Sequence, residues 1–509
     1  MAGTVWCGIG LIALVALYLR FFQGKGKTDI DRRARIGVLL LGVTGLDIVP
    51  ILLHERFTHL IQPTIEWWND QVAAWVTAML WVPHHVAGLV ACLTGFLLLW
   101  DVTRFPDRRG RLAVAATAGV MFASALGLTI YVTLVFAIFL GIWVPIAFFR
   151  NNRAHARLIC LSGLTAFLLA LPYLIELFAG DSGPTGAGPL LRFAVKPFTF
   201  VDWLFKLDGG WRMAVTNLML LPLNYSLELG FFLIAGVLQG AVLWRQRHSL
   251  TDERVCSFVM AAVSFVVCTF VQSGVIGNND FGWRGMMIAQ FVLLMCGAEL
   301  LTEGLLSSNA RRGRSHVRAR HWRGLIVATL VLGTAGSAYE VVKIRFFPLA
   351  SDRALTGKMR WLAPDGRLGA RTHALRQLYE TLKQRTPIDA VFQHNPDTDP
   401  QDSFHGMYAD RQLAAETLTC GVIFGGDAGR CRNRIGDIAA MFDRSKLFDP
   451  TRIEESCGRL SIDVLVVKDT DSVWRDPESW VWKRQPFAAN PYGRAFYCGS
   501  VTSSQTGTP

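Results

Sequence analysis

Asp47 is the first residue whose type and place could do chemistry, because it lies inside an apolar run of membrane length. A charged carboxyl group at the centre of a bilayer costs about 2.5–3.5 kcal/mol on an insertion scale, so such residues usually have a specific role. Gly45 and Pro50 beside it weaken a helix, so we expect a break near the carboxylate. Asp47 then either hydrogen-bonds to a neighbouring helix or faces an external cavity as a general base.

The segment that follows adds one acidic residue and two histidines. Glu66 lies among closely spaced tryptophans, which predict an amphipathic helix in the plane of the membrane interface. There Glu66 is either solvated or a second candidate base. His84 and His85 follow Pro83 at the start of the next apolar run. One histidine can bond to a helix start, whereas a pair can hold a phosphate or relay a proton. Their spacing fits no zinc motif, and we predict no metal site.

The short loop 277–284 holds a third group of polar residues. Asn279 and Asp280 suit the geometry of a tight turn. Arg284 opens the next apolar run on the side opposite to most basic residues, where it can grip a lipid phosphate through two parallel hydrogen bonds. The candidate substrate-binding residues are therefore His84, His85, Asn279, Asp280 and Arg284.

Membrane spans are the elements that must position these residues. The chain has 509 residues, of which 51% are hydrophobic and 18% charged, and its mean hydropathy is +0.33. These values exclude a disordered chain, a collagen-like repeat and a small disulfide-stapled fold. Ten runs are apolar and long enough to be spans, at 4–22, 36–54, 84–100, 112–127, 129–148, 158–179, 222–244, 255–275, 284–304 and 323–341.

Basic residues set the predicted orientation of these spans. The net charge of +12 would suggest a nucleic-acid partner in a soluble protein, but here Lys and Arg gather in the links between spans. With ten spans every basic link falls on one side, which the positive-inside rule makes cytoplasmic. If 112–127 and 129–148 formed one kinked helix, the first basic links would oppose the later ones. We therefore predict ten spans in the inner (cytoplasmic) membrane, an external N-terminus and no nucleic-acid partner.

Composition changes after Arg345, where the chain becomes polar and rich in Asp and Arg. We therefore divide it into a transmembrane helical domain, 1–345, and an extracytoplasmic α/β domain, 346–509, that ends in a disordered tail. In the second domain we predict buried strands at 388–393 and 462–467, amphipathic helices at 366–385 and 408–419, and a turn at 425–427.

The ten cysteines also divide between the two domains. Six lie in the apolar runs, where they are packed thiols. The other four have neither a CxxC motif nor a metal spacing, so disulfides are the plainer interpretation, with three pairings open. These four are Cys420, Cys431, Cys457 and Cys498.

The polar residues of the spans concentrate at one predicted depth, the outer membrane boundary. The candidate site residues map there, and so do four residues that each suit the end of a span: Glu176, Asn224, Glu228 and Glu340. Glu299 and Glu303 map to the inner side, so no continuous polar file crosses the bilayer. This pattern indicates an external cavity and opposes a channel or a proton-coupled carrier.

Five short motifs together point to a family: Thr44-Gly45-Leu46-Asp47, Ile65-Glu66-Trp67-Trp68, Trp81-Val82-Pro83-His84-His85, Asn279-Asp280-Phe281-Gly282-Trp283-Arg284 and Ala409-Asp410-Arg411-Gln412. In this order the chain resembles large bacterial membrane proteins of the glycosyltransferase-C type, and the resemblance covers most of its length. It implies a multi-span helical bundle with an external active site. Such enzymes transfer a sugar from a polyprenyl-phosphate donor, using an Asp or Glu as base and cations to hold the donor phosphate.

Carried over to this chain, the resemblance implies Asp47 or Glu66 as the base. Arg284, with a protonated His84 or His85, would stabilise the departing phosphate. The donor would be a polyprenyl-phosphate-linked sugar, and the partners would be this sugar lipid and other membrane lipid. Members of this group usually carry an acidic motif in a first external loop, after a first span. We expect that span and loop to be absent here, or to come from a second membrane subunit.

Two other functions remain open at this stage. One is a non-catalytic relative, acting as a scaffold or a lipid-glycan-binding subunit, and the other is a lipid-linked glycan transporter or ligase of another fold. The enzyme requires Asp47 or Glu66 to face a cavity beside Arg284. The scaffold predicts that these side chains are buried against neighbouring helices, and a transporter needs polar groups in the inner half of the bundle.

Overall fold

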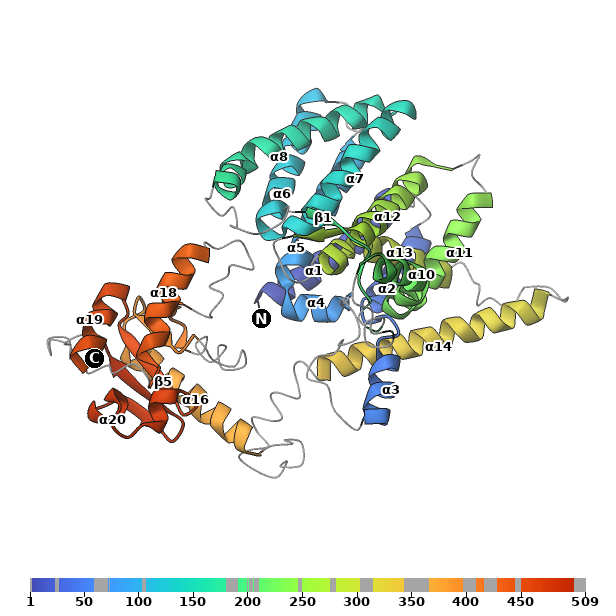
Figure 1. Cartoon of the computed structure of the whole chain (residues 1–509). Coiled ribbons are helices and arrows are strands. Elements are labelled where there is room, and N and C mark those ends of the chain that lie inside the picture. The colour runs from blue at the N-terminus through green and yellow to red at the C-terminus, as the bar shows by residue number, and fades with distance from the viewer. Residues whose placement is uncertain are drawn as a thin grey trace. The chain divides into compact units, whose positions relative to one another are not determined.

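The computed structural model describes the following parts of the chain: residues 2–22, 27–58, 72, 74–102, 107–179, 191–198, 200, 205, 210–245, 250–274, 281–302, 315–342, 366–396, 409–415, 428–444 and 450–498. They form two compact units, one made of 1–180 and 188–342 and the other of 181–187 and 343–509. The first unit is a helical bundle and the second a small α/β domain (Figure 1), which is the predicted fold class.

Within the described residues, eight helical segments are long and apolar enough to cross a membrane. They comprise α1 (Ala2–Phe22), α5 (Pro83–Asp101), α6 (Arg108–Leu128), α7 (Ile130–Phe149), α8 (Arg153–Ala179), α12 (Asp252–Phe270), the π-helix η2 (Phe281–Gly285) with α13 (Met287–Thr302), and α14 (Ser315–Val341). A bend of 113° separates α10 (Gly210–Leu229) from α11 (Phe231–Arg245), and this pair would make a ninth span.

The second of the ten predicted spans differs most from expectation. Instead of one helix over 36–54, the structure has α2 (Lys27–Leu40) and α3 (Ile48–Thr58), and neither reaches the length of a span. The break falls at Asp47, where Gly45 and Pro50 predicted it. By contrast, the predicted runs 112–127 and 129–148 are separate helices, α6 and α7, with the extended residue Thr129 between them.

Aromatic rings and glycines hold the bundle together. Phe96 of α5 contacts Phe136 and Phe139 of α7 edge-on, and Trp100 of α5 stacks on Trp143 of α7. Glycines allow helices to approach closely, as is common in membrane bundles. A Cβ on Gly119 of α6, for example, would lie 2.6 Å from Thr165 Cβ of α8.

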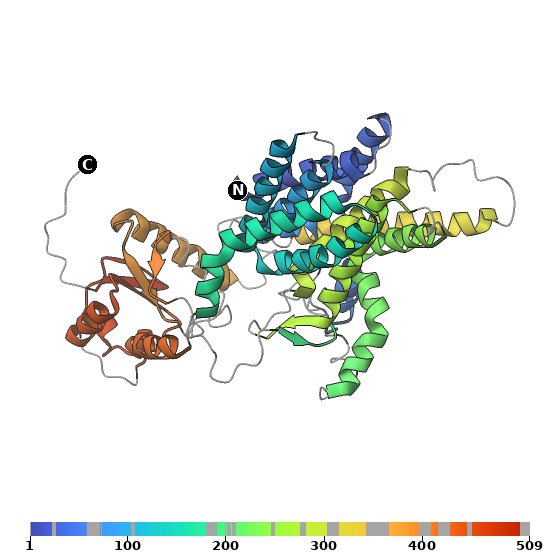
Figure 2. The same ribbon diagram turned by 90° about the horizontal axis from the view of Figure 1, so that it is seen from above.

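A short two-stranded sheet continues from the end of α12 (Figure 2). β1 (Leu191–Phe193) pairs with β2 (Val271–Ser273) in antiparallel register, with Arg192 opposite Gln272. The pairing carries the residues that follow β1 along the end of α12, where Ala194 N–H donates to Phe270 O at 3.1 Å. This places the segment 194–198 inside the bundle unit, beside η2.

In its described residues the α/β domain has a five-stranded sheet in the order β4-β3-β5-β7-β6. Its strands are β3 (Val391–His394), β4 (Gln412–Leu413), β5 (Val464–Lys468), β6 (Ala488–Asn490) and β7 (Gly493–Tyr497). β3 runs parallel to β4 and β5, and the remaining pairs are antiparallel. The predicted strands 388–393 and 462–467 match β3 and β5, and every residue of β5 is buried.

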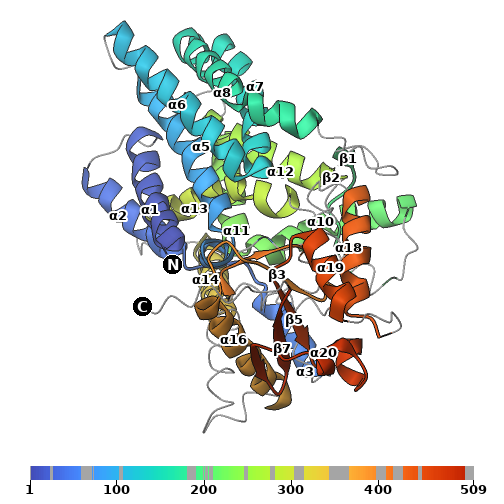
Figure 3. The ribbon, with the colours of Figure 1, turned by 90° about the vertical axis from the view of Figure 1, so that its left-hand side faces the viewer.

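Helices cover both faces of this sheet (Figure 3). Val464 and Val466 pack with α16 (Gly366–Arg385), whose range matches the predicted helix, while Leu465 and Val467 pack with α18 (Ala428–Met441) and α19 (Pro450–Leu460). A strand that is buried on both faces reads as a continuous apolar run, which is why the sequence predicted it.

The helix predicted at 408–419 is wrong for its described part, 409–415. Asp410 has a φ of 53°, which ends regular helix, and β4 follows in parallel register with β3. The guanidinium of Arg411 donates to Thr386 O at 2.8 Å, so a side chain and not a helix satisfies the backbone here. The predicted turn at 425–427 and the tail lie outside the described residues.

One predicted disulfide is present, between Cys457 of α19 and Cys498 after β7. Cys420 and the side chain of Cys431 lie outside the described residues, so a second bridge stays a prediction. The six cysteines of the apolar runs are free thiols, as predicted, and all but Cys160 and Cys296 are buried.

Candidate functional site

The break that contains Asp47 is held by two other parts of the bundle. Between α2 and α3 the backbone cannot bond to its own helix, and it bonds to neighbours instead. Thr44 N–H donates to Gly333 O of α14 at 3.2 Å, and Leu46 N–H donates to Leu227 O of α10 at 2.5 Å. The non-helical backbone is therefore buried in protein, which is the condition for tolerating it at membrane depth.

Gly45 is required by this close approach. A Cβ at that position would lie 2.2 Å from Glu228 O and 2.3 Å from Leu227 O, which no side chain can do. Gly333 faces the same constraint from the other side, because its Cβ would lie 2.4 Å from Thr44 O. The glycine that predicted a loosened helix in fact permits a backbone-to-backbone clamp.

Three carboxylates converge at this clamp: Asp47, Glu228 and Glu340 are each 1% exposed and interact electrostatically. Asp47 Oδ2 accepts a hydrogen bond from Thr44 Oγ1 at 3.0 Å. Glu228 Oε2 accepts from Val72 N–H at 2.7 Å, and Glu340 accepts from the Thr77 hydroxyl. We call this group the carboxylate cluster.

The carboxylate cluster is tightly enclosed. The cavity beside Glu228 and Thr44 has a volume of about 10 Å³, room for one water molecule at most. Among the described residues no group of three or more His, Cys, Asp or Glu side chains has the geometry of a metal site. Buried carboxylates that are close together are stabilised by hydrogen bonds and by sharing protons, and the donors from Thr44, Val72 and Thr77 supply the first of these.

A second group forms around Arg284, which lies in η2 and is 4% exposed. Its guanidinium carbon lies 5.5 Å from the ring centre of Trp81 and 5.2 Å from that of Trp283, distances that allow cation–π attraction. Trp81 ends α4 (Trp75–Trp81) and is 53% exposed, so this group reaches the surface of the bundle.

Both predicted histidines join Arg284. They begin α5 directly after Pro83, a residue well suited to a first helical turn. The His84 and His85 rings lie 4.1 Å apart, and both interact electrostatically with Arg284. His85 is buried and its Nδ1 lies 2.7 Å from Thr129 Oγ1, whereas His84 is exposed.

Lys196 bonds to the π-helix that carries Arg284, and the sequence analysis did not single it out. It follows β1 and is fully buried, and its Nζ donates to Gly282 O of η2 at 3.3 Å. Its backbone N–H donates to Thr269 O at 2.7 Å, which fixes its place beside the end of α12. The available signal was a lone Lys in the otherwise apolar stretch 194–198, within a segment predicted to be an external loop. We call Arg284, His84, His85 and Lys196 the basic cluster.

The structure thus sorts the predicted site residues into two groups. Arg284, His84 and His85 come together, whereas Asp47 is 1% exposed and lies with Glu228 and Glu340 instead of facing a cavity beside Arg284. Glu66, Asn279 and Asp280 lie outside the described residues. The groups meet at α4, where Thr77 bonds to a carboxylate and Trp81 lies under Arg284. Residues four apart share one face of a helix, about 6 Å apart along its axis.

Comparisons with known proteins add distant similarities. The chain matches no family model. An uncharacterized protein of Sinorhizobium fredii is 23% identical over 333 residues, which are 63% of this chain and 45% of that protein. The crystal structure of an Archaeoglobus fulgidus oligosaccharyltransferase in complex with zinc and sulfate aligns with 92% of this chain and 55% of its own, with a TM-score of 0.40 and 12% identity. The chain therefore spans about half the length of each.

Proposed function

We propose that this protein is a membrane glycosyltransferase that takes a sugar from a polyprenyl-phosphate donor at the extracytoplasmic end of the bundle. The observation that carries the proposal is the basic cluster. Arg284 and two histidines gather beside exposed Trp81, and Lys196 bonds to the same π-helix, at the end of the bundle that we predict to be the outer one.

The reaction assigns one task to each cluster. The basic cluster holds the donor phosphate and stabilises the negative charge that it gains as the bond from sugar carbon to phosphate oxygen breaks. A carboxylate takes the proton of the acceptor hydroxyl while its oxygen bonds to the sugar carbon. Asp47 is the proposed base, which requires its enclosure to open to the acceptor, because Asp47 is 1% exposed in this structure. Glu66 is the other candidate. Thr77 and Trp81 on one face of α4 would bring acceptor and donor together.

The test separates donor binding from transfer. Asp47→Asn keeps the shape and removes the base, so transfer should fall about 10²- to 10⁴-fold while donor binding is retained. Arg284→Lys keeps the charge but loses the planar fork, so donor binding should weaken. Exposed Arg212 lies 5.8 Å from the Trp211 ring centre, and Arg212→Lys is the matched control. Both activities are measured in vesicles that contain purified protein and a polyprenyl-phosphate sugar pool.

The second candidate is a non-catalytic scaffold or lipid-glycan-binding subunit. The burial of Asp47 against Thr44 favours it, because a structural hydrogen bonder needs no access to a substrate. This candidate takes the lead if Asp47→Asn transfers like the wild type, or if Arg284→Lys leaves donor affinity unchanged.

The proposal also requires the C-terminal α/β domain to lie outside the inner membrane. The predicted cytoplasmic position of the basic links supports this orientation. Alkaline phosphatase fused after Arg345 should be active, and an expressed but inactive fusion would reverse the orientation.

A further inference from the structure

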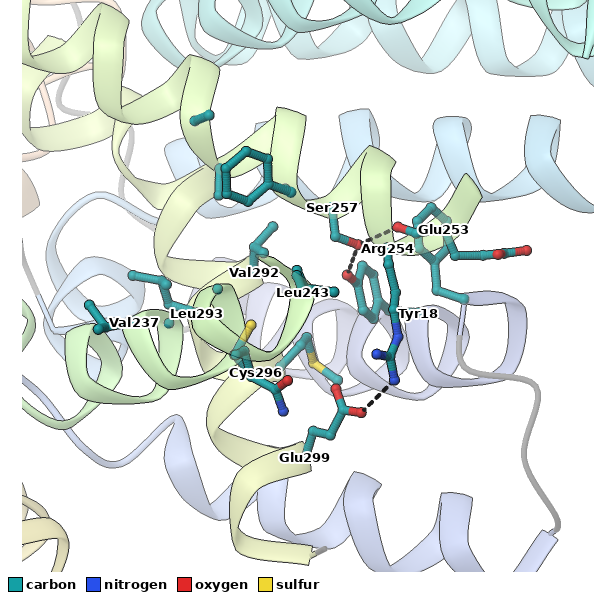
Figure 4. Close-up of a pocket in the computed structure, with 18 of the residues that line it drawn as sticks. Tyr18, Val237, Leu243, Glu253, Arg254, Ser257, Val292, Leu293, Cys296 and Glu299 are labelled. Atoms are coloured by element: carbon teal, nitrogen blue, oxygen red, sulfur yellow. Dashed lines mark hydrogen bonds and ion pairs between the residues drawn. The ribbon is translucent and has the colours of Figure 1, made fainter. Parts of the chain in front are cut away.

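A larger cavity lies in the same bundle, away from both clusters, between α1, α11, α12 and α13 (Figure 4). Its volume is about 660 Å³, within the range of pockets that bind small ligands. α11 and α12 both pack on α13, and the cavity separates them. Val237 of α11 is 61% exposed and Phe258 of α12 is 58% exposed, so the opening between these helices faces the lipid side of the bundle.

The lining changes from charged to apolar along the cavity. On α12 the order is Glu253 and Arg254, then Ser257, then Ala261 and Phe265. α13 runs the opposite way, and its Leu293 and Glu299 give the same gradient in reverse. Figure 4 shows Val237 and Leu293 at one end, and Glu253, Arg254 and Glu299 at the other. The cavity therefore has one charged end and one apolar end.

Its length matches one leaflet of a bilayer. Arg254 and Phe265 are eleven residues apart, so the lining of α12 extends over about 16 Å. That is about half of the ~30 Å hydrocarbon core. A lipid chain from a single leaflet fits these dimensions with its headgroup at the charged end. Arg284 and Glu299 lie at opposite ends of η2–α13, about 22 Å apart, so this cavity is separate from the basic cluster.

The charged end presents both signs to an incoming headgroup. Arg33 is 1% exposed and pairs with Glu299 and Asp29, each at 3.8 Å, so it belongs to the floor. Arg254 is 38% exposed and pairs with Glu299 at 3.6 Å, and Glu253 beside it is half-buried. The accessible rim therefore offers one guanidinium next to one carboxylate.

We propose that this cavity binds a zwitterionic phospholipid of the phosphatidylethanolamine type from the leaflet at the inner end of the bundle. Its phosphate accepts hydrogen bonds from Arg254, its ammonium donates to Glu253, and one acyl chain occupies the space between α11 and α12. The acyl chain contributes little binding free energy, because the bilayer that it leaves is as apolar as the cavity that it enters. The headgroup therefore decides which lipid binds. This site is independent of the proposed glycosyltransferase activity.

Native mass spectrometry of the delipidated full-length protein, titrated with phosphatidylethanolamine or phosphatidylglycerol, tests the proposal. Phosphatidylethanolamine should bind roughly tenfold more tightly, as one charge-assisted hydrogen bond would give. Arg254→Gln should weaken its binding by about the same factor. Glu253→Gln should remove the preference by raising the relative affinity for phosphatidylglycerol. Equal or tighter binding of phosphatidylglycerol to the wild type overturns the proposal.

A filling variant tests the cavity itself. Gly240 lines it, and a Cβ there would meet nothing within 4 Å, so Gly240→Phe can enter the empty space without a backbone clash. Gly141 of α7 is equally open but lies outside the cavity, and Gly141→Phe is the matched control. Phosphatidylethanolamine binding should fall at least tenfold in the first variant and stay within about twofold in the second. Full binding by a folded, monodisperse Gly240→Phe protein places the lipid elsewhere and overturns the proposal.

Discussion

The carboxylate cluster and the basic cluster both contact α4 of the same bundle. They differ in whether their charged groups bond to the chain itself or are accessible to a ligand. Each carboxylate accepts a hydrogen bond from the chain itself, and the adjoining cavity of about 10 Å³ has room for one water molecule at most. The basic cluster reaches the surface through His84 and Trp81. A costly charge inside a membrane protein can thus serve packing or binding, and its access to a ligand distinguishes the two roles.

The comparison is sharpest at Gly45, the centre of the clamp. Gly45→Ala should destabilise the protein by about 3 kcal/mol or more, because the added methyl group overlaps the backbone of α10. The melting temperature of the detergent-solubilised protein measures this. Gly127→Ala is the control, since a Cβ there meets nothing within 4 Å. A Gly45→Ala protein as stable as the control would mean that the clamp does not hold the break.

Thr77→Val tests whether the carboxylate cluster is structural. It removes the donor to Glu340 while keeping the shape of the side chain, so stability should fall by about 1–3 kcal/mol. Thr216→Val is the matched control, because half-buried Thr216 bonds to its own helix at Arg212 O. Equal melting temperatures for the two variants would contradict a structural role for this contact.

Lys196→Met tests the opposite expectation for the basic cluster. The charge is lost but the apolar length of the side chain is kept, so folding should change little while affinity for a polyprenyl-phosphate donor falls about tenfold. Donor titration and thermal melting of the same preparation separate these effects. A large loss of stability with unchanged donor affinity would assign Lys196 to the fold, through Gly282 and not through a ligand.

His84→Gln should have the smallest effect, a loss of about threefold in donor affinity, because His84 is exposed and its contact with a phosphate is screened by water. His321→Gln is the control, because His321 on α14 is also exposed and does not belong to the basic cluster. Indistinguishable donor affinities in the two variants would remove His84 from the proposed binding residues and leave His85 and Arg284.

Residue patterns predicted those parts of the molecule that depend on local sequence. All the apolar runs except 36–54 and the bent 222–244 matched helices of span length, the continuous run at β5 matched a strand, and Gly45 with Pro50 predicted the break at Asp47. Arg284, His84 and His85 were grouped because each lies at the outer end of a predicted span. The depth of a residue in the membrane can be predicted from its position along an apolar run.

Lateral arrangement could not be predicted in the same way. Glu228 and Glu340 were expected only to end their spans, because nothing in the sequence shows that α10, α14 and the break at Asp47 share one clamp. Lys196 was missed because its segment is apolar but shorter than a span, and only the pairing of β1 with β2 draws it inside. The helix predicted at 408–419 failed because tertiary pairing with β3 overrides local helical pattern.

The sheet of the α/β domain has a consequence for how the protein behaves among its neighbours. In the part of the domain that the structure describes, the fully buried strand β5 lies in the middle of the sheet, and the edges are β4 with two residues and β6 with three. An unpaired edge strand can pair with a strand of another chain, and a short edge strand offers few backbone hydrogen bonds for such pairing. We therefore expect this domain to resist aggregation with other chains through its sheet edges, although the central strand β5 has an aggregation-prone sequence.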